Sequence, residues 1–315
     1  MPPLFRSSFQ DCPEPPTRDN LVSMRNLLLQ LDTSRLPSSF DQVVAFDGGA
    51  DEIMSYGGVT PEDVRDLIHG CIFTRGPQDL RHTAVWIGGA NLAAGELVLE
   101  SAQKAVFPPF TVSMMLDSNG SNTTAVAAVL KIEQTVGSVS GLRALVVAGT
   151  GPVGLRAAGL LARAGARVRI TSRKPEDGER AGRAIAARFG GVIESLALRD
   201  AAQAEVALDG QEILLNCGPA GILMIPNPVW AGRAGLRVAV DLNAVPPLGI
   251  EGIDVQDDGV PREGLTVFGA LGVGNFKTKL HKTCIARLFE RNDIILDAET
   301  IMDVAHQIAT AKNKK

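Results

Sequence analysis

The sequence VVAGTGPVG at residues 146–154 decides the fold, because it matches the glycine pattern GxGxxG between an expected strand and an expected helix. The strand is predicted over residues 144–148. After the turn, apolar residues recur at helical spacing at Val153, Ala157, Leu160, Leu161 and Ala164. A second apolar strand is predicted at 167–171. The segment therefore predicts a strand–helix–strand unit whose two strands are parallel.

Each glycine of this pattern has its own use in a turn that binds a dinucleotide. Gly149 permits the tight turn, Gly151 lets the backbone approach a pyrophosphate, and Gly154 lets the helix pack closely on the strand. Free N–H groups at the helix N-terminus then face the phosphates. The alternative is a glycine-rich turn without a ligand. The residues predicted to contact a cofactor here are Gly149, Thr150, Gly151, Pro152 and Val153.

The end of the second strand indicates which dinucleotide is bound. NAD-binding proteins usually carry an acid there, which bonds the ribose hydroxyls. This chain has Ser172, Arg173 and Lys174 instead, and the first acid is Glu176. Two cations and a hydroxyl would hold a 2′-phosphate, with Arg173 able to bind it through two hydrogen bonds. We predict NADP as the cofactor; the alternative is that Arg173 and Lys174 only solvate a helix start.

Length and composition exclude several classes of protein. The 315 residues suggest about two domains. With 45% hydrophobic and 21% charged residues, the chain is not disordered as a whole. A net charge of −4 and 4% aromatic residues argue against nucleic-acid binding. The uncharged run at 213–232 is broken by prolines and glycines, so we expect no membrane span there.

The start of the chain and its cysteines suggest where the protein works. The N-terminus has no signal-peptide pattern. The four cysteines are scattered and form no CxxC pair, so we expect reduced thiols in a cytoplasmic protein. These cysteines are Cys12, Cys71, Cys217 and Cys284.

Alternating strand and helix patterns predict an α/β protein with parallel sheets. Strands are expected at 27–31, 43–46, 83–87, 110–116, 144–148, 167–171, 192–195, 213–216, 237–240 and 266–268, and the last two helices at 275–290 and 298–312. A Gly/Ser linker at 137–141 separates two such series. We predict a flexible arm at 1–22 and a smaller α/β substrate domain at 23–120, completed by a C-terminal helix at 295–315. A Rossmann-type nucleotide-binding domain is predicted at 121–294, with a cleft between the two domains.

Polar segments follow four of the expected strands, where ligands bind in open α/β sheets. They lie at 47–51, 117–124, 216–221 and 241–247. Turn chemistry alone is the alternative for each, since Asn, Asp and Gly favour turns. In the second series we predict cofactor contacts from Cys217, Gly218 and Asn243. No histidine spacing suggests a metal site, and neither a GxSxG elbow nor a GxxxxGK[ST] loop is present.

Taken together, these motifs resemble the NADP-dependent methylene-tetrahydromethanopterin dehydrogenases of one-carbon metabolism. The resemblance runs from about residue 27 to the C-terminus. It is carried by FDQVVAFDGGAD at 40–51, MLDSNGSNTT at 115–124, AGTGPVG at 148–154, NAVPPLGI at 243–250 and FGALGVGNFK at 268–277. The first 20 or so residues are an addition to the family pattern.

The resemblance implies a reaction: methylene-tetrahydromethanopterin and NADP give the methenyl cation and NADPH. Some members accept the tetrahydrofolate derivative, and a sister group accepts NAD. The family's active-site lysine falls on Lys277. Members are homo-oligomers, and a trimer or hexamer fits here. The candidate contacts to the pterin are Asp41, Asp47, Asp117, Asn122 and Asn243.

This reaction requires no general base, because hydride leaves a carbon between two nitrogens and no proton moves. An ammonium opposes the developing cation, so Lys277 is expected to anchor or orient the substrate. Two other functions stay open. A shikimate-dehydrogenase-like NADP alcohol dehydrogenase would need a Lys/Asp pair for proton transfer. A non-enzymatic NADP-sensing protein would bind NADP without transferring hydride.

Overall fold

The computed structural model describes residues 24–312 and contains two β-sheets. The first sheet has five parallel strands in the order β12-β4-β3-β1-β2. Its strands are β1 (Leu27–Asp32), β2 (Glu52–Gly57), β3 (Thr83–Gly88), β4 (Ser113–Leu116) and β12 (Ile295–Leu296). The helices and short 3-10 turns that connect them are α1 (Ser39–Asp47), α2 (Pro61–Ile72), η2 (Asp79–His82), α3 (Leu92–Ala105) and η3 (Ser118–Gly120).

The second sheet has seven strands in the order β10-β11-β9-β8-β5-β6-β7, and only the β10–β11 pair is antiparallel. Its strands are β5 (Arg143–Val147), β6 (Arg167–Ser172), β7 (Ile193–Ala197), β8 (Ile213–Asn216), β9 (Val238–Asp241), β10 (Asp258–Arg262) and β11 (Leu265–Phe268). The helices between them are α5 (Pro152–Arg163), α6 (Pro175–Phe189), α7 (Ala201–Leu208) and α8 (Asn227–Trp230). Read from β7, the strand order is that of a Rossmann sheet.

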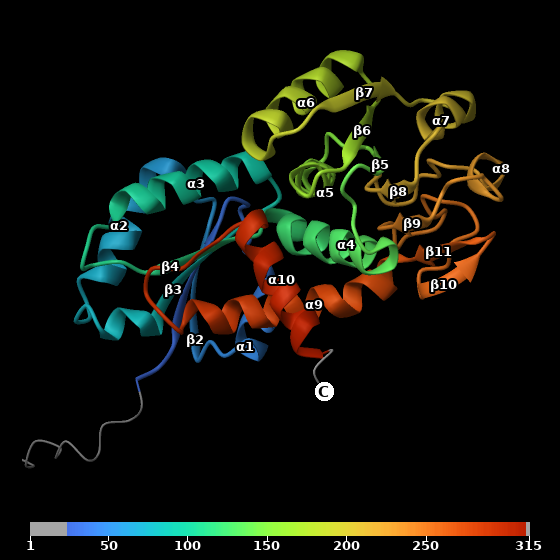
Figure 1. Ribbon diagram of the computed structural model, residues 1–315. Coiled ribbons are helices and arrows are strands. Elements are labelled where there is room, and N and C mark those ends of the chain that lie inside the picture. Colours follow the sequence, from blue (N-terminus) through green and yellow to red (C-terminus); the bar gives the residue numbers. More distant parts are fainter. Residues whose placement is uncertain (1–23, 313–315) are drawn as a thin grey trace, which may run out of the picture.

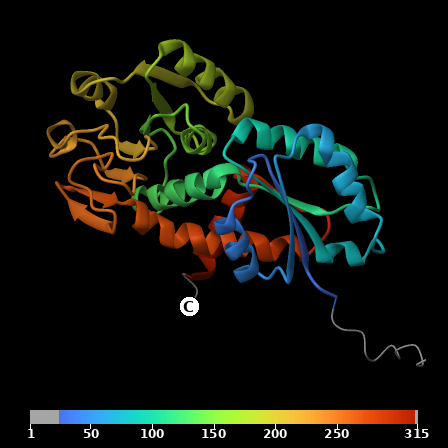
Figure 2. The same ribbon diagram turned by 180° about the vertical axis from the view of Figure 1, so that it is seen from behind.

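Three helices lie between the two sheets: α4 (Ser121–Val136) and α9 (Ala270–Leu288), which connect them along the chain, and α10 (Ala298–Lys312), which follows β12. Figure 1 shows α4 and α9 running side by side between the sheets, and α4 also packs on α5 and α10. From behind, the same helices again lie between the two sheets (Figure 2). One continuous core joins Trp86 of the first sheet, Leu280 of α9 and Val146 of the second.

The strands alternate their side chains between two cores, as buried parallel strands do. In β1, Leu29 and Leu31 face α2 and α3, while Leu28 faces the core shared with α9. In β5, Val146 faces that shared core and Val147 faces the core under α7 and α8. Both sheets are therefore covered on two sides.

The predicted α/β class with a Rossmann-type parallel sheet is confirmed. Strand β12 pairs with β4, so the C-terminal segment does join the first sheet. The domain boundaries and the cleft between domains stay predictions, and the arm at 1–22 lies outside the described residues. No helix within residues 24–312 is long and apolar enough to span a membrane.

The predicted strand at 43–46 is wrong, because these residues belong to helix α1. The Ser38 hydroxyl accepts a hydrogen bond from the backbone N–H of Asp41 at 3.2 Å and so caps the helix. A short apolar run fits a helix or a strand equally well. Here Val44 and Ala45 are buried while Val43 and Phe46 stay exposed. The segment at 47–51 therefore follows a helix and not a strand.

Candidate functional site

The glycine turn between β5 and α5 has the close packing that its sequence predicts. A Cβ on Gly149 would lie 2.6 Å from Cβ of Ile170 on β6. One on Gly154 would lie 2.7 Å from the Ala148 carbonyl oxygen and from Cα of Gly149. The N–H of Gly149 donates to the carbonyl of Thr171 at 3.0 Å, which ties the turn to the end of β6. Only glycine allows these approaches.

A pocket of about 640 Å³ opens at the carboxyl ends of the second sheet, beside this turn. It lies where the strand order reverses, between β5 and β8. Its walls bring together seven of the predicted cofactor residues: Thr150, Gly151, Pro152, Ser172, Arg173, Lys174 and Cys217. The pocket is further lined by Ala148, Thr171, Asp177, Leu198, Pro219, Ile222 and Met224.

These walls fit a phosphorylated dinucleotide. Helix α5 begins at Pro152, so its N-terminal end borders the pocket and favours an anion. Arg173 and Lys174 line the pocket beyond β6. The one carboxylate in the lining, Asp177, is bound to Arg180 at 2.6 Å. Arg199, which sequence reasoning missed, donates to the Arg173 carbonyl at 2.8 Å and adds a third cation nearby.

Four predicted cofactor residues do not line this pocket. Gly149 lies in the glycine turn and Val153 in the first turn of α5, and the N–H of Gly218 donates to Asn216 Oδ1 at 3.1 Å. Asn243 is buried, and its side chain organises two loops by accepting from the backbone of Gly221 and Val245. Cys217 does line the pocket, and burial together with the nearby Asp241 carboxylate raises the pKa of its thiol. Cys217 therefore contributes a neutral thiol to the wall of the pocket.

A second pocket, of about 380 Å³, opens at the carboxyl ends of the first sheet. It lies at the reversal of strand order between β1 and β3, where ligands bind in sheets of this order. It is lined by Asp32, Ser34, Leu36, Ser38, Phe40, Asp41, Gly89, Ala90, Asn119, Gly120, Thr124 and Lys277. Two predicted site residues, Asp41 and Lys277, thus meet in it from α1 and α9.

The charges of this second pocket influence one another. Burial and the Asp117 carboxylate raise the pKa of Asp41 to about 6, although Ser38 and Lys277 act in the opposite direction. The Lys277 ammonium lies 4.6 Å from the centre of the Phe40 ring, a cation–π contact. One turn along α9, buried His281 stacks on Trp86 at 4.6 Å. Burial and Lys277 lower the pKa of His281 to about 3, so it stays neutral.

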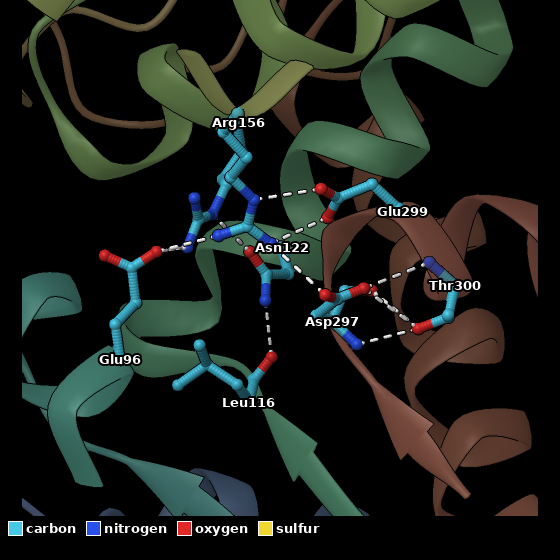
Figure 3. Close-up of polar contacts among 8 residues, drawn as sticks. Glu96, Leu116, Asn122, Arg156, Asp297, Glu299 and Thr300 are labelled. Carbon is cyan, nitrogen blue, oxygen red and sulfur yellow. Dashed lines mark hydrogen bonds and ion pairs between the residues drawn. The ribbon is translucent and has the colours of Figure 1, made fainter. Parts of the chain in front are cut away.

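Four predicted substrate residues lie outside the lining of this pocket: Asn243, whose bonds are given above, and Asp47, Asp117 and Asn122. Asp117 caps α4: its carboxylate accepts from the backbone of Asn122 and Thr123 and from the Thr123 hydroxyl, the last at 2.6 Å. Asn122 is buried and donates to the Leu116 carbonyl at 2.5 Å (Figure 3). Asp47 pairs with Lys282 at 2.7 Å on the surface.

The loop after β1 supplies pocket residues that sequence reasoning missed, chiefly Asp32, Ser34 and Ser38. Asp32 is buried, and its carboxylate accepts from the backbone of Ser34 and Ser38. The sequence carried a signal for Asp32, because this residue directly follows the apolar strand predicted at 27–31. Within the described part of the chain, no group of three or more His, Cys, Asp or Glu side chains could hold a metal ion.

Comparison with known proteins places the chain in a family. Residues 39–119 match the family model described as "Methylene-tetrahydromethanopterin dehydrogenase, N-terminal". The chain is 45% identical over 286 residues to "Bifunctional protein MdtA" of Methylorubrum extorquens, covering 90% of this chain and 99% of that protein. It is 33% identical to the "NAD(P)-dependent methylenetetrahydromethanopterin dehydrogenase" of the same organism, with the same coverage.

A solved structure supports the fold alone. Shikimate 5-dehydrogenase from Listeria monocytogenes aligns over 90% of this chain and 98% of its own, with a TM-score of 0.52 and 11% identity. At such low identity the likeness says nothing about the substrate. The two Methylorubrum proteins are far more similar, at 45% and 33% identity over 99% of their lengths. This chain therefore belongs to the methylene-tetrahydromethanopterin dehydrogenase family.

Proposed function

We propose that this protein is an NADP-dependent methylene-tetrahydromethanopterin dehydrogenase, which also acts on methylene-tetrahydrofolate. The observation that carries the proposal is the 45% identity to the MdtA protein over 99% of that protein's length. The two pockets at the carboxyl ends of the two sheets support it, because one suits a dinucleotide and the other a polar ring.

The first pocket supports NADP as the hydride acceptor. When bound, NADP accepts hydride at C4 of its nicotinamide ring. Thr150 and Gly151 would hold the pyrophosphate at the start of α5. Arg173 and Lys174 would hold the 2′-phosphate, with Ser172 as a further hydrogen-bond partner. A carboxylate at their place would repel that phosphate.

The second pocket supports binding of the pterin. An ionised Asp41 accepts hydrogen bonds from a pterin N3–H and 2-amino group in a bidentate pair. Lys277 would anchor the ring from the α9 side, and its ammonium, held over Phe40, would orient the substrate rather than stabilise the cation that forms. No proton moves in this step, so the reaction needs neither His281, which is neutral, nor Asp41 as a base.

An alcohol dehydrogenase of the shikimate type is less well supported, because the chain belongs to another family. Such an enzyme needs a group that takes the proton of the hydroxyl while hydride leaves. Asp117 is fully buried and its carboxylate bonds the first turn of α4, so Asp41 is the carboxylate that lines the pocket with Lys277.

The test is the formation of NADPH, followed by its absorbance. Purified protein receives NADP or NAD, each with methylene-tetrahydromethanopterin and then with methylene-tetrahydrofolate. We expect the fastest turnover with NADP and the methanopterin derivative. A protein that binds NADP by calorimetry and yet turns over neither pterin would refute the proposal.

We further propose that the enzyme is a cytoplasmic homo-oligomer, a trimer or a hexamer. The resemblance of the sequence to the family supports the assembly, and the three free thiols among the described cysteines, Cys71, Cys217 and Cys284, suit a reducing compartment. Light scattering after gel filtration measures the assembly. A monomer at micromolar concentration would rule it out.

A further inference from the structure

A buried arginine joins the two sheets between the two pockets. Arg156 lies in the second turn of α5 and is only 4% exposed. Its Nε donates to Asn122 Oδ1 at 2.9 Å, and its Nη2 donates to Glu96 Oε1 at 2.5 Å (Figure 3). One guanidinium on a helix of the second sheet thus holds two groups from other helices.

Both partners of Arg156 are fixed to the first sheet. The Asn122 side chain donates to the Leu116 carbonyl at the end of β4, at 2.5 Å. Glu96 lies on α3, which packs on β3 and β4. Glu96 also accepts from Arg188, which in turn binds Asp297 and Glu299 beside β12.

The hydrogen bonds from Arg156 to Asn122 and from Asn122 to Leu116 connect segments that lie next to the two pockets. Helix α5 begins at the turn whose Gly151 and Pro152 line the larger pocket. Leu116 lies just before Asn119 and Gly120, which line the smaller pocket beside Lys277. Hydrogen bonds of Arg156 and Asn122 thus connect α5 to the end of β4, next to the residues that line the smaller pocket.

Stability alone is a poor reason for this arrangement. Burying a guanidinium costs several kcal/mol, and an apolar residue of similar volume is often as stable or more so. Geometry is a better reason. Hydride transfer needs the reacting atoms about 3–3.5 Å apart, and a misplacement of about 1 Å can cost about a hundredfold in rate.

We propose that Arg156 is a positioning residue, which sets the cofactor pocket against the substrate pocket for hydride transfer. This inference rests on the proposed function. Arg156 lines neither pocket; it acts through Asn122 and the end of β4. Replacing Arg156 should leave the binding of NADP and of the pterin unchanged. It should slow hydride transfer, because that step needs both ligands correctly placed relative to each other.

The test compares Arg156→Met, Arg156→Lys and the control Arg188→Met. Arg188 shares Glu96 with Arg156 but has no contact with Asn122. We expect Arg156→Met to lower kcat at least about tenfold, while the calorimetric Kd for NADP and the KM for the pterin stay within about threefold. With a substrate deuterated at the methylene carbon, its kinetic isotope effect on kcat should rise. Arg156→Lys keeps the charge beside Glu96 and should be intermediate.

The control separates positioning from stability. Arg188→Met should lower the melting temperature and keep kcat and the isotope effect of the wild type. If Arg156→Met does not fold, Asn122→Asp replaces it: the acceptor for Arg156 is kept and the contact becomes an ion pair, the donor to Leu116 is lost, and the same fall in kcat is expected. An active wild type with an equally active Arg156→Met, or an equal fall in kcat in Arg188→Met, overturns the positioning role alone. An inactive wild type overturns the proposed function and this role together.

Discussion

Replacing Asp41 by asparagine is expected to stabilise the protein at pH 8 and not at pH 4. Burial first, then the charges of Asp117 and Asp32, raise the pKa of Asp41 from 3.8 to about 6. The folded state therefore binds the proton more tightly than the unfolded state does. The contribution of Asp41 to the free energy of unfolding is therefore fully present below pH 4 and is lost as the pH rises through 6. Above pH 4 the unfolded chain loses the Asp41 proton, while the folded chain keeps it until about pH 6.

The size of the effect follows from that pKa. Each pKa unit corresponds to about 1.4 kcal/mol, so the ionised carboxylate costs the fold at most about 3 kcal/mol above pH 6. Asp41 is partly exposed, and solvent screens its repulsion. Because Asp41 lies in the first turn of α1, the helix dipole stabilises its ionised carboxylate by about 0.3–1 kcal/mol. We expect Asp41→Asn to gain about 1–2 kcal/mol at pH 8.

Urea unfolding followed by circular dichroism at pH 4 and pH 8 measures both values. The matched control is Asp47→Asn, which removes an exposed carboxylate of the same helix. Its loss of the surface pair with Lys282 should cost at most about 1 kcal/mol. The stabilised Asp41→Asn protein should bind the pterin more weakly, since it lacks the carboxylate that a bidentate pair needs. A variant no more stable than the wild type at pH 8 would contradict this reasoning.

Three further substitutions test separate parts of the site. Lys277→Ala should lower kcat at least about tenfold with an unchanged Kd for NADP; a variant with wild-type turnover would remove Lys277 from the site. Arg173→Ala should raise the KM for NADP at least about tenfold and leave that for NAD unchanged, since it removes a charge-assisted bond to the 2′-phosphate; equal effects on both cofactors would contradict that contact. Thr123→Val leaves Asp117 Oδ2 without its 2.6 Å donor and should cost about 1–3 kcal/mol in urea unfolding, which an unchanged midpoint would disprove.

Much of the fold could be predicted, because the strand–turn–helix segments carry strong local signals. The glycine turn places β5, α5 and β6 almost to the residue, and the polar end of β6 identifies the second wall of the cofactor pocket. Weak segments were missed for physical reasons. Strand β2 lies at a sheet edge with mostly exposed residues, so it lacks the apolar alternation of a buried strand. Strand β12 has two residues and depends on pairing with distant β4.

The site was harder to predict, because the same residue types cap helices and bind ligands. Asp117 and Asn122 follow a strand as ligand residues would, yet their bonds go to the start of α4 and the end of β4. Lys277 and Asp41 meet only because α9 packs beside α1, a contact between segments far apart in the sequence. The hydrogen bonds of Arg156 join it to Asn122 and Glu96, which are distant in the sequence, so no local sequence pattern predicts them.

The most direct test of the central claim follows the fate of one hydrogen. The protein converts methylene-tetrahydromethanopterin, dideuterated at the methylene carbon, with NADP in ordinary water, and mass spectrometry weighs the reduced cofactor. Direct hydride transfer predicts that every molecule of reduced NADP carries deuterium, and that unlabelled substrate in heavy water gives none. Reduced cofactor without deuterium from the labelled substrate, or no reduced cofactor at all, would contradict the account.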